Sequence, residues 1–150
     1  MGAGKSTFAR ALATSLEAAL LSEDDLLREL YPGQVIDLGT YATFSGRIRH
    51  ALAGHICTLL RQGTSVVLDF PGNTPRQRAW FRQLIDSSGA KHQLHYLNVP
   101  DAICRQQLGQ RRATNGGDPL QDDATFDALL AHFAPPGREE QFSVVLHERT

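Results

Sequence analysis

The first seven residues, Met-Gly-Ala-Gly-Lys-Ser-Thr, have the residue types and spacing of a phosphate-binding loop that runs into a helix. Glycines let backbone N–H groups approach phosphate oxygens, and the N-terminus of the following helix adds positive charge at the same place. In this pattern Lys5 reaches the β- and γ-phosphates of a nucleotide, and the Ser6 hydroxyl binds Mg²⁺. The predicted phosphate-binding residues are Gly2, Ala3, Gly4, Lys5, Ser6 and Thr7.

Carboxylates at two later points would complete a site for phosphoryl transfer. Asp24 and Asp25 follow a short apolar segment, and Asp69 stands near the end of the apolar run 64–70. Ends of parallel strands share one edge of a sheet with such a loop, so we expect these side chains to lie close to it. Asp24 or Asp25 would accept the proton of an acceptor hydroxyl, and Asp69 would contact Mg²⁺, Ser6 or the acceptor. The plainer interpretation of each is a helix or strand cap.

Several cationic or amide side chains stand where they would hold a phosphate or the acceptor. Arg28 lies one helical turn beyond the two acidic residues, where it clamps a ligand or forms a surface ion pair. Arg111 and Arg112 precede a glycine-rich segment, where one of them would close over the moving phosphate unless both belong to a solvated basic helix. Further candidates for acceptor contacts are Asn73, Arg76 and Arg78.

The apolar pattern predicts the elements that position these groups. Helices are expected at 6–19, 23–30, 43–61, 75–88 and 101–112, with a last one from 123 or 125, and strands at 20–22, 64–70, 92–99 and 142–146. Strands that alternate with helices predict an α/β fold, a doubly wound parallel sheet flanked by helices in one domain of 150 residues. Residues 34–40 are expected as loop and the region of about 105–122 as a mobile lid.

The strand that normally delivers such a loop is expected to be missing from this chain, because nothing precedes Met1. In a doubly wound sheet that strand lies in the middle. Three explanations stay open: a start codon placed too late, a fragment, or another segment that fills the gap.

Composition limits the classes of partner. Charged residues make up 21% of the chain and the net charge is −1, so neither an extended nucleic-acid surface nor a membrane surface is indicated. Cys57 and Cys104 are expected to be reduced thiols, since they lie far apart in apolar helical contexts. His92 and His95 would point to opposite faces of a strand, which argues against a shared metal site. With no signal peptide and no membrane-length apolar run, the expected compartment is the cytoplasm.

Four segments together carry a family resemblance: Gly-Ala-Gly-Lys-Ser-Thr, Leu-Ser-Glu-Asp-Asp-Leu-Leu-Arg, Val-Val-Leu-Asp-Phe-Pro-Gly-Asn-Thr and Leu-Asn-Val-Pro. In this order they resemble the AAA-type ATP-binding proteins of the P-loop kinase superfamily, relatives of polynucleotide kinase, zeta toxin and chloramphenicol phosphotransferase. The resemblance covers essentially the whole chain. It implies a three-layer P-loop NTPase fold with a five-stranded parallel core, ATP and Mg²⁺ as cofactors, and transfer of a phosphate to a hydroxyl.

The resemblance also implies roles for single residues. Asp24 matches the carboxylate that activates the acceptor hydroxyl, and Arg111 matches the lid arginine. One departure is that the arginine expected three residues after the base is Leu27 here, with Arg28 next. Either Asp25 is the base, therefore, or the arginine contact is rebuilt.

The expected function is transfer of the γ-phosphate of ATP to a hydroxyl of a small molecule or nucleotide. The alternatives are a non-catalytic ATP-binding regulatory module and a truncated, inactive homologue.

Overall fold

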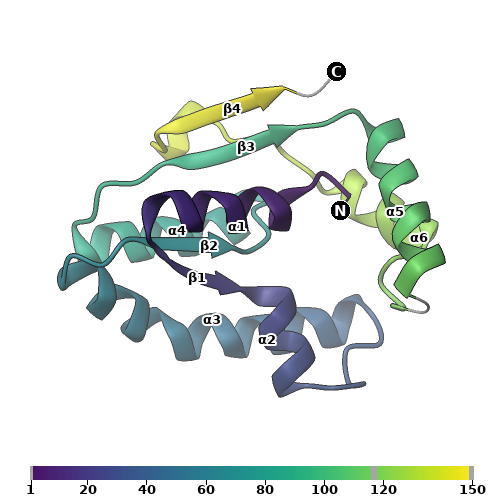
Figure 1. Cartoon of the computed structure of the whole chain (residues 1–150), viewed down its shortest axis with the longest axis horizontal. Helices are drawn as coiled ribbons and strands as arrows, with labels where there is room; N and C mark the ends of the chain where they lie inside the picture. The colour runs from purple at the N-terminus through teal and green to yellow at the C-terminus, as the bar shows by residue number, and fades with distance from the viewer. Residues whose placement is uncertain (1, 116–117, 149–150) are drawn as a thin grey trace.

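Strands and helices alternate along the chain in the computed structural model, which describes residues 2–115 and 118–148 (Figure 1). This alternation confirms the predicted α/β fold. In chain order the elements are α1 (Lys5–Leu16), β1 (Ala19–Ser22), α2 (Glu23–Leu30), α3 (Leu38–Arg61), β2 (Val66–Asp69), α4 (Pro75–Ser88), β3 (Leu94–Asn98), α5 (Asp101–Asn115), α6 (Asp123–Ala131), the 3-10 helix η1 (Arg138–Glu140) and β4 (Val144–Glu148).

The strands form two parallel pairs, as the prediction of a parallel arrangement flanked by helices requires. β1 pairs with β2, which sets Ser22 opposite Asp69, and β3 pairs with β4. Within the described residues the two pairs are separate two-stranded sheets. Figure 1 shows all strands pointing the same way, with their C-terminal ends toward the start of α1 and toward α5. That the strand ahead of the loop is missing stays a prediction.

Helices cover both faces of the β1–β2 sheet because its strands are apolar on both sides. On one face Ala9 and Ala13 of α1 pack on Val67. On the other, α3 and α4 contribute Ile56 and Leu84, which pack with apolar side chains of β1 and β2. Small alanines let α1 approach the sheet closely, so the start of this helix is fixed relative to the ends of β1 and β2.

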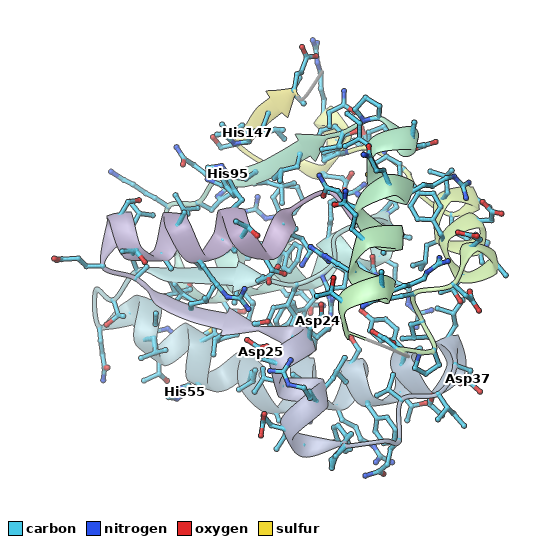
Figure 2. All side chains as sticks on the ribbon, turned by 45° about the vertical axis from the view of Figure 1, so that its right-hand side comes forward. Asp24, Asp25, Asp37, His55, His95 and His147 are labelled. Atoms are coloured by element: carbon cyan, nitrogen blue, oxygen red, sulfur yellow. The ribbon has the colours of Figure 1, made fainter. Side chains whose placement is uncertain are left out.

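The same helix also reaches the β3–β4 sheet. The Phe8 ring of α1 lies 5.2 Å from the His95 ring and 4.7 Å from the His147 ring. The two histidines share a hydrogen bond of 2.9 Å between His95 Nδ1 and His147 Nε2, and Figure 2 shows them on neighbouring strands. His92 instead accepts a hydrogen bond from the backbone of Ser143. His95 therefore pairs with His147 on β4 and not with His92.

Several boundaries differ from the sequence-based expectation. α3 begins at Leu38 and takes in residues expected as loop, because Asp37 and Thr40 form a reciprocal capping box. α5 continues to Asn115, so much of the expected lid at 105–122 is helix. The lid's two glycines, 116 and 117, lie outside the described residues.

The structure also bears on the two cysteines and on membrane-spanning segments. Both Cys57 and Cys104 are buried free thiols, as predicted. No helix in the described part of the chain has the length and apolar character needed to cross a membrane.

Candidate functional site

The loop before α1 has the backbone shape that a phosphate site needs. Gly2 and Gly4 adopt left-handed conformations, with φ of 74° and 79°, which side-chain-bearing residues rarely take. Gly4 is the N-cap of α1 and provides no side-chain cap, whereas α2, α4 and α6 are capped by side chains. The amides at the start of α1 therefore have no capping side chain to occupy them, and the dipole of the helix favours an anion there.

Packing against α5 fixes the other end of the loop. A Cβ atom on Gly2 would collide with the backbone oxygen of Cys104 in α5. Ala3 packs on the buried cluster that Cys104, Leu108 and Phe126 form. Further along, Ser6 is half-buried and Thr7 is exposed. The loop is thus packed against α5 at Gly2 and Ala3, and the first turn of α1 beside it is half-buried to exposed.

Lys5 connects this loop to the end of β2. Its ammonium group forms an ion pair with the Asp69 carboxylate. Asp69 is only 3% exposed, and Lys5 is its side-chain partner in the described structure, so the pair explains how a charge is tolerated at a buried strand end. Ser6 lies next to Lys5 in the first turn of α1. The predicted phosphate and magnesium residues thus come together at one edge of the β1–β2 sheet.

Asp24 and Asp25 stand side by side at the start of α2, but their surroundings differ (Figure 2). Asp24 is exposed to solvent, although the protein around it desolvates its carboxylate. Desolvation raises its pKa, Lys5 opposes this, and the carboxylates of Asp69, Glu23 and Asp118 raise it further. Asp24 is therefore electrostatically coupled to Lys5 and Asp69. A carboxyl with a raised pKa near a phosphate site suits proton transfer.

Asp25 instead belongs to a surface cluster of charges. Arg28 donates a 2.7 Å hydrogen bond to Asp25, and Arg10 lies 3.8 Å away. That hydrogen bond from Arg28 is the main cause that lowers the pKa of Asp25. The side chains of Arg28 and Asp25 are 66% and 41% exposed. Arg28, a predicted ligand-binding residue, is thus engaged with Asp25 at the surface.

The connector between β2 and α4 carries Asn73, which is predicted to contact the molecule that accepts the phosphate. Asn73 is half-buried; its backbone amide donates to the Gln77 side chain and its carbonyl accepts from Ala134. Arg78 has a different role from the one considered above, because it is 1% exposed and bonded to Glu140 and to the carbonyl of Gly72. That arginine holds the connector in place and is not accessible to an acceptor.

The two candidate lid arginines, Arg111 and Arg112, have different surroundings. Arg112 donates to the backbone oxygen of Gln121 and forms a 3.0 Å ion pair with Asp123. Arg111 lies exposed on α5. Arg112 thus fastens the end of α5 to the start of α6, and Arg111 remains the residue with a side chain in solvent.

Sequence reasoning missed Glu23. It is fully buried directly before Asp24, and Tyr41, Ser45 and Arg49 of α3 all donate to it. An acidic residue at the first position of a helix is a common feature, so nothing local distinguishes Glu23 from its neighbours. The i, i+4, i+8 spacing of its three donors was the available signal.

Comparisons with known proteins agree with this architecture. The family model described as "AAA domain" matches residues 1–136. A crystal structure of a candidate kinase from Chloroflexus aurantiacus J-10-fl resembles the chain with a TM-score of 0.70 and 18% sequence identity, over 97% of this chain and 79% of that one. At this identity the likeness concerns the fold. Among curated proteins no significant match was found.

Proposed function

This chain belongs to the AAA domain family, within the P-loop kinase superfamily, and we propose that it transfers the γ-phosphate of ATP to a hydroxyl of a small molecule or nucleotide. The observation that carries the proposal is the position of Lys5. It stands in the first turn of α1, pairs with Asp69 and acts electrostatically on Asp24. A phosphate-binding loop beside a carboxylate with a raised pKa is what transfer to a hydroxyl needs.

The residues present fit ATP and Mg²⁺. The glycine loop and the uncapped start of α1 would receive the phosphates, and Lys5 would exchange its Asp69 partner for them. Ser6 and Asp69 would hold Mg²⁺, because hydroxyl and carboxylate oxygens are the ligands that this ion prefers. When bound, the ion supplies positive charge that neutralises the phosphates.

We assign Asp24 as the base that accepts the proton of the acceptor hydroxyl. The acceptor oxygen would form a bond to the γ-phosphorus as the bond from that phosphorus to the β–γ bridging oxygen breaks, and ADP would leave with the bonding electrons. The acceptor proton would pass to the Asp24 carboxylate, whose raised pKa makes it a stronger base than a carboxylate at its ordinary pKa. Asp25 is less suited because the hydrogen bond from Arg28 lowers its pKa and so makes it a weaker base.

The remaining candidates complete the proposal. Arg111, exposed on α5, would close over the transferring phosphate, while Arg112 secures the helix that carries it. Arg28 and Asn73 would border the acceptor. Two free buried thiols suit a reducing compartment, and we place the activity in the cytoplasm on that ground.

Binding and turnover of Mg²⁺-ATP test the proposal. Calorimetry should show that Lys5→Ala weakens binding by about tenfold or more, since a charge-assisted contact to phosphate is lost. Turnover should be measured first with water as acceptor and then with a panel of hydroxyl compounds and nucleosides. Asp24→Asn should reduce it by about 100-fold or more while ATP affinity changes little.

Asp25→Asn is the matched control, because it makes the same change one residue away. It should retain turnover. If instead Asp25→Asn abolishes turnover and Asp24→Asn keeps it, the base has been assigned wrongly. ATP binding without turnover for any acceptor would favour the non-catalytic regulatory alternative, and unaltered affinity in Lys5→Ala would refute the phosphate loop.

A further inference from the structure

Glu23 forms the centre of a buried polar cluster between α2 and α3. Its carboxylate is 0% exposed. It accepts hydrogen bonds from Tyr41 Oη at 2.6 Å, Ser45 Oγ at 2.5 Å and Arg49 Nε at 3.2 Å. The three donors are spaced four residues apart, so they share one face of α3. Both carboxylate oxygens are occupied, and Glu23 is therefore fixed rather than available to a ligand.

Arg49 carries this connection onward to the end of β2. Its guanidinium donates from one terminal nitrogen to the Pro71 carbonyl at 3.0 Å and from the other to the Gln77 carbonyl at 3.2 Å. The same group lies over the rings of Phe70 and Trp80, at 5.5 and 4.9 Å from their centroids. A guanidinium can make these contacts together because its planar fork presents several fixed donors and a face that stacks on rings.

The chain neighbours of this cluster are the two carboxylates of the site. Glu23 directly precedes Asp24, and Phe70 directly follows Asp69. One guanidinium thus contacts a residue adjacent to each carboxylate. A buried ion pair contributes little net stability compared with apolar packing. The Glu23–Arg49 pair is therefore better explained by the geometry that it fixes than by the stability that it adds.

We infer that Glu23 and Arg49 are positioning residues that set the separation between Asp24 and Asp69 on either side of Lys5. The inference rests on the proposed function for its catalytic meaning, although the geometric effect stands independently. Neither residue acts on substrate: Glu23 acts through Asp24, and Arg49 acts through Glu23 and through Pro71 in the connector between β2 and α4. Tyr41 and Ser45 hold the Glu23 carboxylate in the orientation that Arg49 requires.

Arg49→Lys is the sharpest test, because lysine keeps the charge that pairs with Glu23 but lacks the fork. Crystal structures should show the separation between the Cα atoms of Asp24 and Asp69 changed by about 0.5 Å or more, the tolerance of a catalytic arrangement. The kcat for Mg²⁺-ATP hydrolysis with water as acceptor should fall by about 10- to 100-fold, with the KM for ATP within about twofold.

Arg82→Lys is the matched control. Arg82 makes the same kinds of contact on α4, an ion pair with Asp86 and a hydrogen bond to the backbone of Gln141, away from this cluster. It should leave kcat, KM and the carboxylate separation unchanged. If Arg49→Lys does not fold, Tyr41→Phe replaces it, since it removes one donor without changing charge; its kcat should fall by about threefold or more.

Two outcomes overturn the inference: an unchanged Asp24–Asp69 separation in the folded variants, or a kcat equal to that of the wild type. A rise in the KM for ATP with kcat unchanged also overturns it, because that would place the cluster in nucleotide binding. Failure of the proposed function looks different: the wild type itself would not turn over ATP. In that case the carboxylate separation still decides whether Arg49 positions the two residues.

Discussion

Replacing Arg78 with methionine should destabilise the chain by about 3–5 kcal/mol, the cost of breaking a buried ion pair from one side. Arg78 is 1% exposed. Its guanidinium forms a two-pronged contact with Glu140, at 2.8 and 2.7 Å, and donates to the carbonyls of Gly72, Ala134 and Pro135. It therefore joins the connector after β2 to the segment that precedes η1.

The size of this loss of stability follows from the groups that lose their hydrogen-bond partner when Arg78 is replaced. Methionine fills much of the space of the arginine stem, so the apolar packing is largely kept. Glu140 loses its ion-pair partner, and three carbonyls of half-buried or exposed residues lose a donor, at about 1–3 kcal/mol for each group that stays unsatisfied. Water that enters would recover part of this, which keeps the total near 3–5 kcal/mol. For a chain of 150 residues the melting temperature should fall by about 10 °C.

Denaturant unfolding followed by circular dichroism measures this free energy, and Arg82→Met is the control. Arg82 lies one helical turn along α4, is 27% exposed and forms an ion pair with Asp86. Exposed pairs of this kind contribute less than about 1 kcal/mol. A loss below about 1 kcal/mol in Arg78→Met, or an equal loss in both variants, would refute the reasoning.

Arg78→Met should also change how the stability of the chain depends on pH. The hydrogen bond from Arg78 lowers the pKa of Glu140 below its ordinary value of 4.5. Stability from a lowered carboxyl pKa is present above the unfolded value and is lost as pH falls through the folded one. The wild type should therefore lose stability more steeply than Arg78→Met below about pH 4.5. Parallel curves in this range would contradict the assignment.

Further predictions concern the loop and the histidines. Asp69→Asn should free Lys5, so calorimetry should find ATP bound more tightly without Mg²⁺, by less than about tenfold, and a smaller gain on adding Mg²⁺. Gly2→Ala should lower both ATP affinity and melting temperature, since its φ of 74° and a collision with the backbone of α5 each disfavour a Cβ atom. Burial and His147 lower the pKa of His95; stability should therefore fall as pH drops below about 6.5, and His95→Gln should flatten that slope in denaturant unfolding.

Local chemistry explains how much of the fold could be predicted from sequence. The glycine loop, the β-branched run that ends at Asp69 and the helix that opens at Pro75 were all recognisable from neighbouring residues. The start of α3 was not, because Asp37 and Thr40 form a capping box inside a segment that is otherwise polar and loop-like. Short-range patterns thus predicted the elements, and one reciprocal side-chain contact moved a boundary.

Long-range contacts account for what the sequence did not show at the site. Arg78 and Glu140 are separated by 62 positions, and the pattern around Arg78 alone was compatible with a surface residue that contacts an acceptor. Asp24 and Asp25 are the same residue type, so spacing could not rank them. Arg28 is within one helical turn of both, so it could not separate them either, and Lys5 comes near Asp24 only in the folded chain.

The position of α1 has a consequence for the cooperativity of the whole domain. Ala9 and Ala13 dock on the β1–β2 sheet while Phe8 docks on the β3–β4 sheet, so one helix contacts two sheets that are not hydrogen-bonded to each other in the described chain. Local opening of either sheet must loosen α1. An anion that stabilises the start of α1 would therefore slow amide hydrogen exchange in both sheets together, including β4, where Leu146 is more than 120 residues from the loop in sequence.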